Sequence, residues 1–327
     1  MQNPATRSVD FMKRNARAVG TAAILIGMII VYFVLNIFLN GRFLTFQNFN
    51  LILTHAVIPC FLAWGMSVGF TLGMMDFSVG AIIILAANAA GYGGIALGYP
   101  GLFLAAILVA SLLIFANYNV FVRTAVPSWV AGLGLALFYE AIGYLYTTIR
   151  LKQGMQVIDL GNVCRGLLSA PFNYIMLAIG LALAYIIFNR MSIGLNIKAT
   201  GSNSSIARMM GIDTMRTVMI GALVAGLFIG MASALNESYS GRVQPMTGLG
   251  TIAQLFQPMA AFLLAVSIRR IISPTFGIIL SAFFVASIFT ALTMFGVPSG
   301  TFQEVALGLI VILCGIMAQR NFKGVVK

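Results

Sequence analysis

The sequence predicts an all-α polytopic membrane protein that crosses the bilayer about ten times and has both its ends in the cytoplasm. Three observations predict it. Apolar residues make up 60% of the 327 positions, charged residues make up only 8%, and Lys and Arg gather in alternate connections between apolar stretches. Soluble domains are about 45–50% apolar and about 25% charged. A chain with so few charges cannot cover a globular surface, so it belongs in lipid.

Ten apolar stretches come close to the about 20 residues that a helix needs to cross the hydrocarbon layer. In chain order they are 19–39, 50–72, 79–96, 101–121, 128–148, 172–189, 217–237, 251–267, 275–296 and 303–319. The first is too long for the core of a cleaved signal peptide, and no small-residue cleavage site follows it, so we expect it to stay in the protein. The two least regular stretches are 79–96, which is short, and 251–267, which is polar.

The distribution of Lys and Arg predicts the orientation. With the N-terminus in the cytoplasm, 14 of the 19 basic residues fall in cytoplasmic segments. The other five fall outside: Arg42, Arg150, Lys152, Arg165 and Arg242. Removing one stretch would invert all that follows and spoil this excess, which the positive-inside rule requires. The chain therefore divides into a cytoplasmic segment 1–18, a transmembrane domain 19–320 and a cytoplasmic tail 321–327.

The composition also excludes several functions. The net charge of +12 is explained by orientation in the membrane, so it does not indicate nucleic-acid binding. Three scattered cysteines do not form a disulfide framework, and His55, the only histidine, has no Cys/His spacing typical of a metal site. The sequence has no G-x-x-x-x-G-K-[ST] motif for binding ATP and no nucleophile–base–acid set. We expect neither catalysis nor a bound cofactor in this chain.

The loop 190–216 is the longest internal cytoplasmic connection, and its sequence predicts a short helix. Asn203 and Ser204 are placed to cap that helix. Its apolar residues fall along one side: Ile206, Met209, Met210 and Ile212. One interpretation is a solvated connector. The other is a docking surface for a soluble protein, because an apolar side must be buried and the polar side has few basic residues to bind anionic lipid.

Three motifs, taken together, are specific. The segment "ATGSNSSIARMMGI" (199–212) resembles the pattern A-x-G-x-N-x-x-A-A-x-x-x-G-I, with Ser205 and Ile206 in place of the paired alanines. The segment "GMMDFSVG" (73–80) resembles G-x-D-L-S-V-G, and "SGRVQPMTGLG" (240–250) resembles S-x-x-x-x-P-x-x-G-x-G. From about residue 45 to the end, the chain resembles the permease subunits of bacterial ribose/xylose/galactose-type ABC importers.

The resemblance implies a function. A monosaccharide delivered by an extracytoplasmic binding protein would cross the bacterial inner membrane through this subunit and a second permease. A cytoplasmic ATPase subunit would bind the ATP and Mg and drive the transport. The residues expected to couple the permease to that ATPase are Asn203, Ser205, Arg208, Met209, Gly211 and Ile212.

Two alternatives remain. One is a nucleoside or branched-chain amino acid importer of the related superfamily. The other is a secondary transporter or channel that works alone, which the near absence of charged residues from the spans disfavours.

One region departs from the family pattern. Where a Gly-rich turn is expected after span 251–267, this chain has "LLAVSIRRIISPTFG" (263–277), with Leu263 and Leu264 in place of paired glycines and Arg269 and Arg270 in place of a later pair. Glycine allows close backbone approach and positive φ. Its loss favours a permease that pairs with a second, non-identical permease.

The expected translocation pathway lies between two Gly-bearing breaks, 73–78 and 240–250. Interrupted segments in corresponding positions are typical of inverted repeats with a pathway at their interface. The expected pathway residues are Asp76, Ser78, Gln254, Phe256 and Gln257. Amide and aromatic side chains suit a neutral polyol, although the glutamines could equally bridge helices.

Three acids have simpler interpretations beside the functional one. Asp76 could cap the helix that follows it instead of touching substrate. Glu140 and Glu237 could be helix-end residues or contacts for a docked binding protein.

Overall fold

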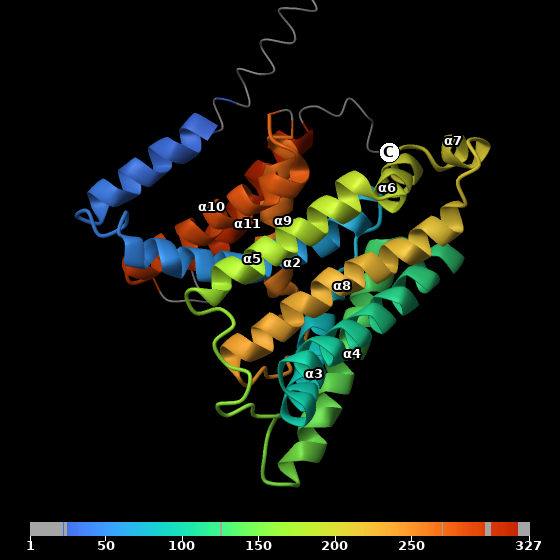
Figure 1. Ribbon diagram of the computed structural model, residues 1–327, viewed down its shortest axis with the longest axis horizontal. Coiled ribbons are helices and arrows are strands. Elements are labelled where there is room, and N and C mark those ends of the chain that lie inside the picture. The colour runs from blue at the N-terminus through green and yellow to red at the C-terminus, as the bar shows by residue number, and fades with distance from the viewer. Residues whose placement is uncertain (1–21, 23–24, 125, 270, 298–301, 320–327) are drawn as a thin grey trace, which may run out of the picture. The chain divides into compact units, whose positions relative to one another are not determined.

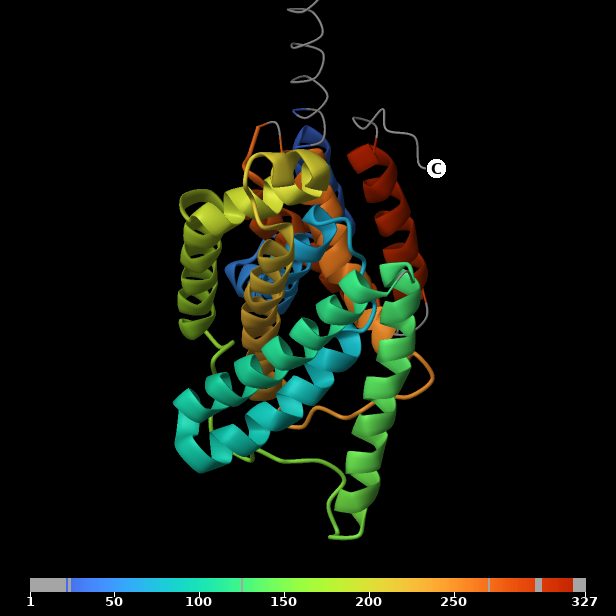
Figure 2. The same ribbon diagram turned by 90° about the vertical axis from the view of Figure 1, so that its right-hand side faces the viewer.

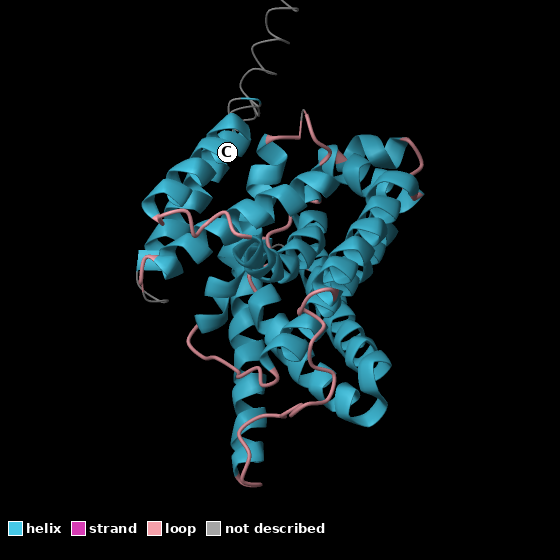
Figure 3. Ribbon diagram, turned by 60° about the vertical axis from the view of Figure 1, so that its left-hand side comes forward, coloured by secondary structure: helices cyan, strands magenta, loops and turns pink. Residues whose placement is uncertain are grey.

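The computed structural model describes residues 22, 25–124, 126–269, 271–297 and 302–319. Within these ranges the chain consists of helices, turns and loops, and it contains no strand (Figure 3). The all-α prediction is therefore confirmed for the described part of the chain. The segments 1–18 and 321–327 and Arg270 lie outside the described residues.

The helices follow the predicted apolar stretches in order (Figure 1). A helix at Leu25–Phe38 precedes the labelled elements. The labelled elements are α2 (Phe46–Thr71), α3 (Val79–Arg123), α4 (Ser128–Leu151), α5 (Phe172–Tyr185), η1 (Ile186–Arg190), α6 (Ser192–Ser202), α7 (Ser204–Met209), α8 (Thr214–Ser240), η2 (Gly250–Ile252), α9 (Ala253–Ser267), α10 (Pro274–Met294) and α11 (Phe302–Gln319).

Seven helical segments of the described chain are long and apolar enough to cross a membrane. They are Phe46–Thr71, Val79–Arg123, Ser128–Leu151, Phe172–Arg190, Thr214–Ser240, Gly250–Ser267 and Pro274–Met294. Two further apolar helices are shorter, Leu25–Phe38 and Phe302–Ile316. A multi-pass membrane protein follows from these lengths and compositions.

Helix α3 is a hairpin of two helices. At about 1.5 Å per residue, 45 residues of straight helix would be about 67 Å long. Yet Asn117 near its end donates a hydrogen bond of 2.6 Å to the hydroxyl of Ser78, which precedes its first residue. The reversal is at Gly98, whose φ of 68° and ψ of −150° are not helical. Figure 2 shows the two teal arms side by side.

The chain forms two units, which are described separately: residues 54–259, and residues 1–53 together with 260–327. In the discontinuous unit, Met28, Leu264 and Cys314 form a buried cluster against which Leu263 packs. Leu263 and Leu264, which stand in place of the family's glycines, therefore pack inside their own subunit. Gly277 lies close to Ala265 in the same unit.

The core of the 54–259 unit is built by α3 and α8. Helix α8 buries many small side chains, among them Ala222, Ala225, Ala232 and Ala234. Small residues let helices in a membrane approach closely enough for van der Waals contact to hold them together. The Asp213 side chain caps α8 by accepting a hydrogen bond of 3.0 Å from the Arg216 N–H, and Gly241 ends the helix in the left-handed conformation.

Candidate functional site

An open cavity of about 300 Å³ lies within the 54–259 unit. Its lining residues come from α2, α3, α8, α9 and the loop before α5: Thr54, His55, Ile58, Pro59, Leu62, Ile83, Leu168, Asn236, Tyr239, Ser240, Gln254, Gln257 and Pro258. The volume is far larger than the about 10–15 Å³ that one water needs, and it reaches the lower end of the about 300–1,000 Å³ typical of ligand pockets.

Polar and aromatic side chains share the wall of this cavity. The rings of His55 and Tyr239 meet edge to face, with centroids 6.1 Å apart and planes at 81°. Asn236 lies one turn before Tyr239 on α8, and Gln254 and Gln257 lie one turn apart on α9. Their amide groups can each donate and accept hydrogen bonds, so the cavity suits a polar ligand.

A non-helical segment, 241–249, leads from α8 to η2 along α3 and α4. Asn88 of α3 donates a hydrogen bond of 3.0 Å to the carbonyl oxygen of Val243. Farther along, Pro245 packs against Gly143 of α4. Irregular backbone is tolerated at membrane depth only where protein or water satisfies its polar groups. Here α3 and α4 supply those contacts.

Glu140 holds the end of that segment. It lies in the middle of α4 and is only 4% exposed. One carboxylate oxygen accepts from the Leu249 N–H at 2.8 Å. The other accepts from the Thr251 N–H at 3.0 Å and from the Thr251 hydroxyl at 2.7 Å. Burying a carboxylate costs free energy, and these three hydrogen bonds offset that cost. The alternative that Glu140 contacts a docked protein is therefore wrong.

Glu237 is also inaccessible, because its exposed fraction is 0%. Neither of its carboxylate oxygens accepts a well-formed hydrogen bond from a described residue, although the Val243 N–H faces it. Its position three residues before the end of α8 agrees with the helix-end interpretation. Its burial rules out contact with a docked protein.

The residues that directly follow the two predicted breaks meet at Gly80. A Cβ atom on Gly80 would collide with the carbonyl oxygen of Thr251, so only glycine lets the start of α3 lie this close to η2. Segments far apart in sequence, one following Asp76 and the other preceding Gln254, are thereby packed together.

A polar cluster holds the start of α3. Asp76 accepts hydrogen bonds from the Ser78 N–H at 2.9 Å, the Ser78 hydroxyl at 2.7 Å and the Asn117 amide at 2.8 Å. The Tyr139 hydroxyl of α4 donates to the Asn117 carbonyl oxygen at 2.6 Å. Burial raises the pKa of Asp76, and the hydrogen bonds from Ser78 and Asn117 oppose that shift. Asp76 thus joins both arms of α3 and, through Asn117, α4.

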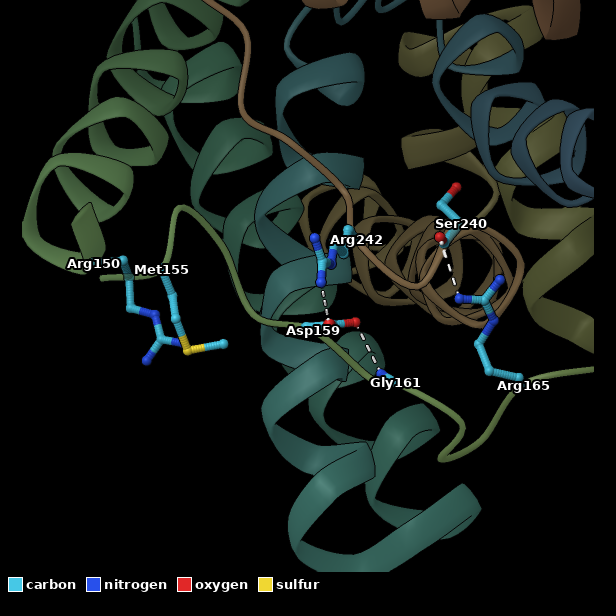
Figure 4. Close-up of polar contacts among 7 residues, drawn as sticks. All are labelled: Arg150, Met155, Asp159, Gly161, Arg165, Ser240 and Arg242. Carbon is cyan, nitrogen blue, oxygen red and sulfur yellow. Dashed lines mark hydrogen bonds and ion pairs between the residues drawn. The ribbon is translucent and has the colours of Figure 1, made fainter. Parts of the chain in front are cut away.

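The loop 152–171 is bonded to the end of α8 and to the residues after it. Arg242 donates to the Asp159 carboxylate, and Arg165 donates to the carbonyl oxygen of Ser240 at 3.4 Å (Figure 4). Arg165 also donates to the carbonyl oxygen of Tyr239 at 3.0 Å. The Leu160 N–H also donates to the Gly241 carbonyl at 3.1 Å. The hydrogen bond from Arg242 lowers the pKa of Asp159 to about 2. The carboxylate is therefore ionised at neutral pH.

The loop 190–216 contains two helices, α6 and α7, of which the sequence predicted only α7. The Asn203 side chain caps α7 by accepting from the N–H groups of Ser205 at 3.0 Å and Ile206 at 3.1 Å. Gly201 of α6 packs so closely on Thr71, at the end of α2, that a Cβ atom there would collide with the Thr71 carbonyl oxygen. Capping by Asn203 is confirmed. Helix α6 was not predicted, because its sequence contains glycines, which disfavour a helix.

Helix α7 presents an apolar surface. Met209 is 80% exposed, Met210 is 74% exposed and Ile206 is 49% exposed. Ala207 is buried, and Arg208 donates a hydrogen bond of 2.9 Å to the Thr214 hydroxyl at the start of α8. Arg208 therefore fixes α7 to α8, while the methionines face outward. Such a group of apolar side chains is typical of a protein-binding surface.

The structure brings some of the predicted pathway residues together and separates others. Gln254 and Gln257 line the cavity, whereas Phe256 is half-buried and does not. Asp76 and Ser78 bond to each other and to Asn117, and neither of them is among the residues that line the cavity. Asn236 and Tyr239 also line the cavity and were not predicted. A polar residue near the end of an apolar span, such as Asn236, is a signal that could have indicated them.

Comparison with known proteins identifies a family. Residues 48–315 match the model of the family described as "Branched-chain amino acid transport system / permease component". No solved structure matched the chain.

Relatives carry a common name, "Autoinducer 2 import system permease protein LsrC". The protein of that name from Enterobacter sp. (strain 638) is 27% identical over 84% of this chain and 79% of the relative. The one from Klebsiella pneumoniae subsp. pneumoniae is 27% identical over 87% of this chain and 82% of the relative. The one from Yersinia pseudotuberculosis serotype O:1b is 26% identical over 93% of this chain and 85% of the relative. The chain belongs to the branched-chain amino acid transport system / permease component family.

Proposed function

We propose that this chain is the membrane-spanning permease subunit of an ATP-driven importer in the bacterial inner membrane, and that it moves a monosaccharide-type solute delivered by an extracytoplasmic binding protein. The family match and the importer name of the relatives support the permease role. The observation that carries the proposal is the capped helix α7, whose exposed methionines offer an ATPase a surface to bind.

The proposal includes a topology of ten spans with inverted repeats and with both ends in the cytoplasm. The seven long segments include α3, whose two arms are about 29 and about 37 Å long, so each can cross the hydrocarbon layer. The shorter helices Leu25–Phe38 and Phe302–Ile316 bring the number to ten. The excess of Lys and Arg in alternate connections supports the orientation.

Cysteine labelling from the two sides of the membrane tests this topology. Ser205→Cys should react only from the cytoplasm and Gln153→Cys only from outside, since both positions are exposed. Native Cys164 is not a suitable reporter, because it is 6% exposed and its thiol faces the Gly94 carbonyl oxygen. Reaction of both variants from one side would contradict the ten-span order.

The proposed coupling residues divide into two roles. Asn203 and Arg208 hold α7 in place through the Ser205 and Ile206 N–H groups and the Thr214 hydroxyl. Met209 supplies the surface, and Ser205 lies exposed near it. Gly211, with a φ of 82°, and Ile212 form the turn that leads into α8. ATP and Mg would be bound by the partner ATPase, because this sequence lacks the phosphate-binding motif.

The proposed pathway runs by Gln254 and Gln257. Asp76 and Ser78 would act by holding the start of α3, which touches η2 at Gly80. Phe256 would lie beside the route, one residue from Gln257.

Charged substitutions on α7 test the coupling. Met209→Asp combined with Met210→Asp should abolish substrate-stimulated ATP hydrolysis by the assembled complex, because two carboxylates cannot enter an apolar interface without a large desolvation cost. Membrane insertion and the amount of folded permease should not change. Met191→Asp, at another exposed methionine before α6, is the matched control and should keep the stimulation. Normal stimulation in the double variant would sink the coupling role.

We also propose that the partner permease is a different chain. Arg269 is exposed where the family pattern has glycine. Leu264, by contrast, packs within its own subunit, so its replacement of glycine does not bear on the partner. The test expresses this chain with its ATPase and binding protein but with no other permease. Full transport by those three components would rule out the need for a second kind of permease.

A further inference from the structure

The cavity of the 54–259 unit has a chemical character that bears on its ligand. No Asp, Glu, Lys or Arg is among its lining residues, and its polar groups are amides, hydroxyls and one imidazole. The charged side chains closest in sequence do not line it: Arg165 donates to the backbone carbonyls of Tyr239 and Ser240, and Glu237 is fully buried beside Gly91 of α3. A ligand with an ammonium group would find no carboxylate here to pair with it.

Two prolines add backbone acceptors to this wall. Pro59 and Pro258 lie inside α2 and α9, and both line the cavity. Proline has no N–H, so the carbonyl four residues earlier loses its intrahelical donor. Those carbonyls belong to His55 and Gln254, which also line the cavity. Two residues of the cavity lining, on two different helices, thus each have a carbonyl without its usual donor, which a hydroxyl group of a ligand can replace.

The aromatic pair supplies a contrasting surface. The edge-to-face rings of His55 and Tyr239 stand on one side, and Ile58, Leu62 and Ile83 contribute apolar area. A sugar ring presents C–H groups on its faces and hydroxyls at its rim. A wall that combines aromatic faces, amides and open carbonyls is complementary to that arrangement.

We propose that this cavity is a binding site for a neutral polyhydroxylated solute, which Gln254, Gln257 and Asn236 recognise by hydrogen bonds and which packs against Tyr239 and His55. Neutral solutes are selected over zwitterionic amino acids because the cavity offers no carboxylate for an ammonium group. The inference rests on the proposed function, whose substrate class it assigns to a particular site.

A thiol reporter in the cavity tests the site on the full-length permease in detergent. Ser240→Cys is a conservative change at an exposed lining position, whereas native Cys60, Cys164 and Cys314 are buried. The rate of reaction with a methanethiosulfonate reagent is measured with D-ribose, D-xylose, D-galactose or L-leucine present. A bound ligand that blocks the thiol slows the reaction by one plus the ratio of its concentration to its Kd, so about threefold at twice the Kd.

We expect at least one of the three sugars to slow the labelling and L-leucine to leave it unchanged. Adding Gln257→Leu should remove the protection. Gln47→Leu, the same substitution at an exposed position in the first turn of α2, should preserve it. Protection by none of the sugars, equal protection by L-leucine, or protection that survives Gln257→Leu would overturn the inference.

The outcome is independent of the test of the proposed function. If no ATPase copurifies with the permease, the importer role fails whatever the reporter shows. If the ATPase binds and is stimulated but the reporter is unprotected, the permease role stands and only the assignment of the cavity fails.

Discussion

The loops 190–216 and 152–171 differ in how they use their side chains. In the first, the polar side chains bond locally, as Asn203 does to the N–H groups of Ser205 and Ile206, and the apolar Met209 and Met210 remain exposed. In the second, Leu160, Arg165 and Asp159 bond to residues 74–83 positions away. One loop leaves an apolar surface exposed, whereas the other fixes part of its own chain.

This difference has a consequence for mutational sensitivity. A change in α7 affects a short helix that contacts the rest of the chain through Ala207 and Arg208, so it should alter binding of a partner more than folding. The segment 241–249 is not helical, so most of its backbone polar groups have no intrahelical partners. A substitution in a residue that contacts it therefore removes a contact that holds its backbone in place. Such a segment depends on α3 and α4, and it should be sensitive to loss of their polar contacts.

The largest expected effect is at Glu140. Glu140→Ala leaves the Leu249 and Thr251 N–H groups without their acceptor, and a buried donor without a partner costs about 1–3 kcal/mol. Two such donors predict a loss of about 2–6 kcal/mol, enough to reduce folded protein sharply. The measurement is the thermal midpoint and the monodisperse yield in detergent. Glu304→Ala, at an exposed acid in the first turn of α11, is the control and should match the wild type. A stable Glu140→Ala protein would mean that the segment is held by other contacts.

An intermediate effect is expected at Asn203. Asn203→Ala removes the side-chain acceptor that caps α7, which costs about 1 kcal/mol in typical helices and lowers the helical population about fivefold. The half-saturating ATPase concentration should rise by no more than that factor, with the thermal midpoint unchanged. Asn203→Asp keeps a capping oxygen and should behave like the wild type. Equal losses in the two variants would show that Asn203 acts through something other than its cap.

The same contrast explains what could be predicted from the sequence. The spans follow from hydropathy, and the cap of α7 follows from the spacing of Asn203 to the apolar side, since both are local properties. The bonds of Glu140 to Leu249 and Thr251 cross 109 and 111 positions, and no local pattern encodes them. The contact of Gly80 with Thr251 also joins residues far apart in the sequence, so no local pattern predicts it.

The residues that line the cavity could also be predicted only in part from the sequence. Gln254 and Gln257 were found because amides are conspicuous in an apolar span, and they do line it. Phe256 was selected as an aromatic residue beside the two amides, but on a helix adjacent residues point in directions about 100° apart. Asn236 and Tyr239 come from α8, and only the folded arrangement brings them to α9. The spans predicted at 79–96 and 101–121, by contrast, correspond to the two arms of the α3 hairpin, which reverses at Gly98.

The smallest expected effect is at the pair that fastens the loop 152–171. Asp159→Asn removes the ion pair with Arg242 but keeps the bonds from Arg165 to the Tyr239 and Ser240 carbonyls. Exposed ion pairs contribute little, so the labelling rate of Ser240→Cys should rise by less than about fivefold. The control is Asn162→Asp, an exposed change in the same loop that adds a carboxylate without touching the pair, and it should leave the labelling rate unchanged.

The pH dependence of that effect has a definite sign. The pKa of Asp159 is lowered to about 2, against about 3.9 in an unfolded chain, so the contribution of the pair is fully present above about pH 4 and is lost as the pH falls through about 2. The ratio of labelling rates between Asp159→Asn and wild-type backgrounds, both carrying Ser240→Cys, should therefore stay nearly constant from about pH 8 down to about pH 3. Taking the ratio cancels the ionisation of the reporter thiol itself. A ratio that approaches one by about pH 3, where an Asp with the ordinary pKa of about 3.9 is mostly protonated, would mean that Arg242 does not hold the carboxylate ionised. The fastening of this loop would then rest on Arg165 and the Leu160 N–H alone.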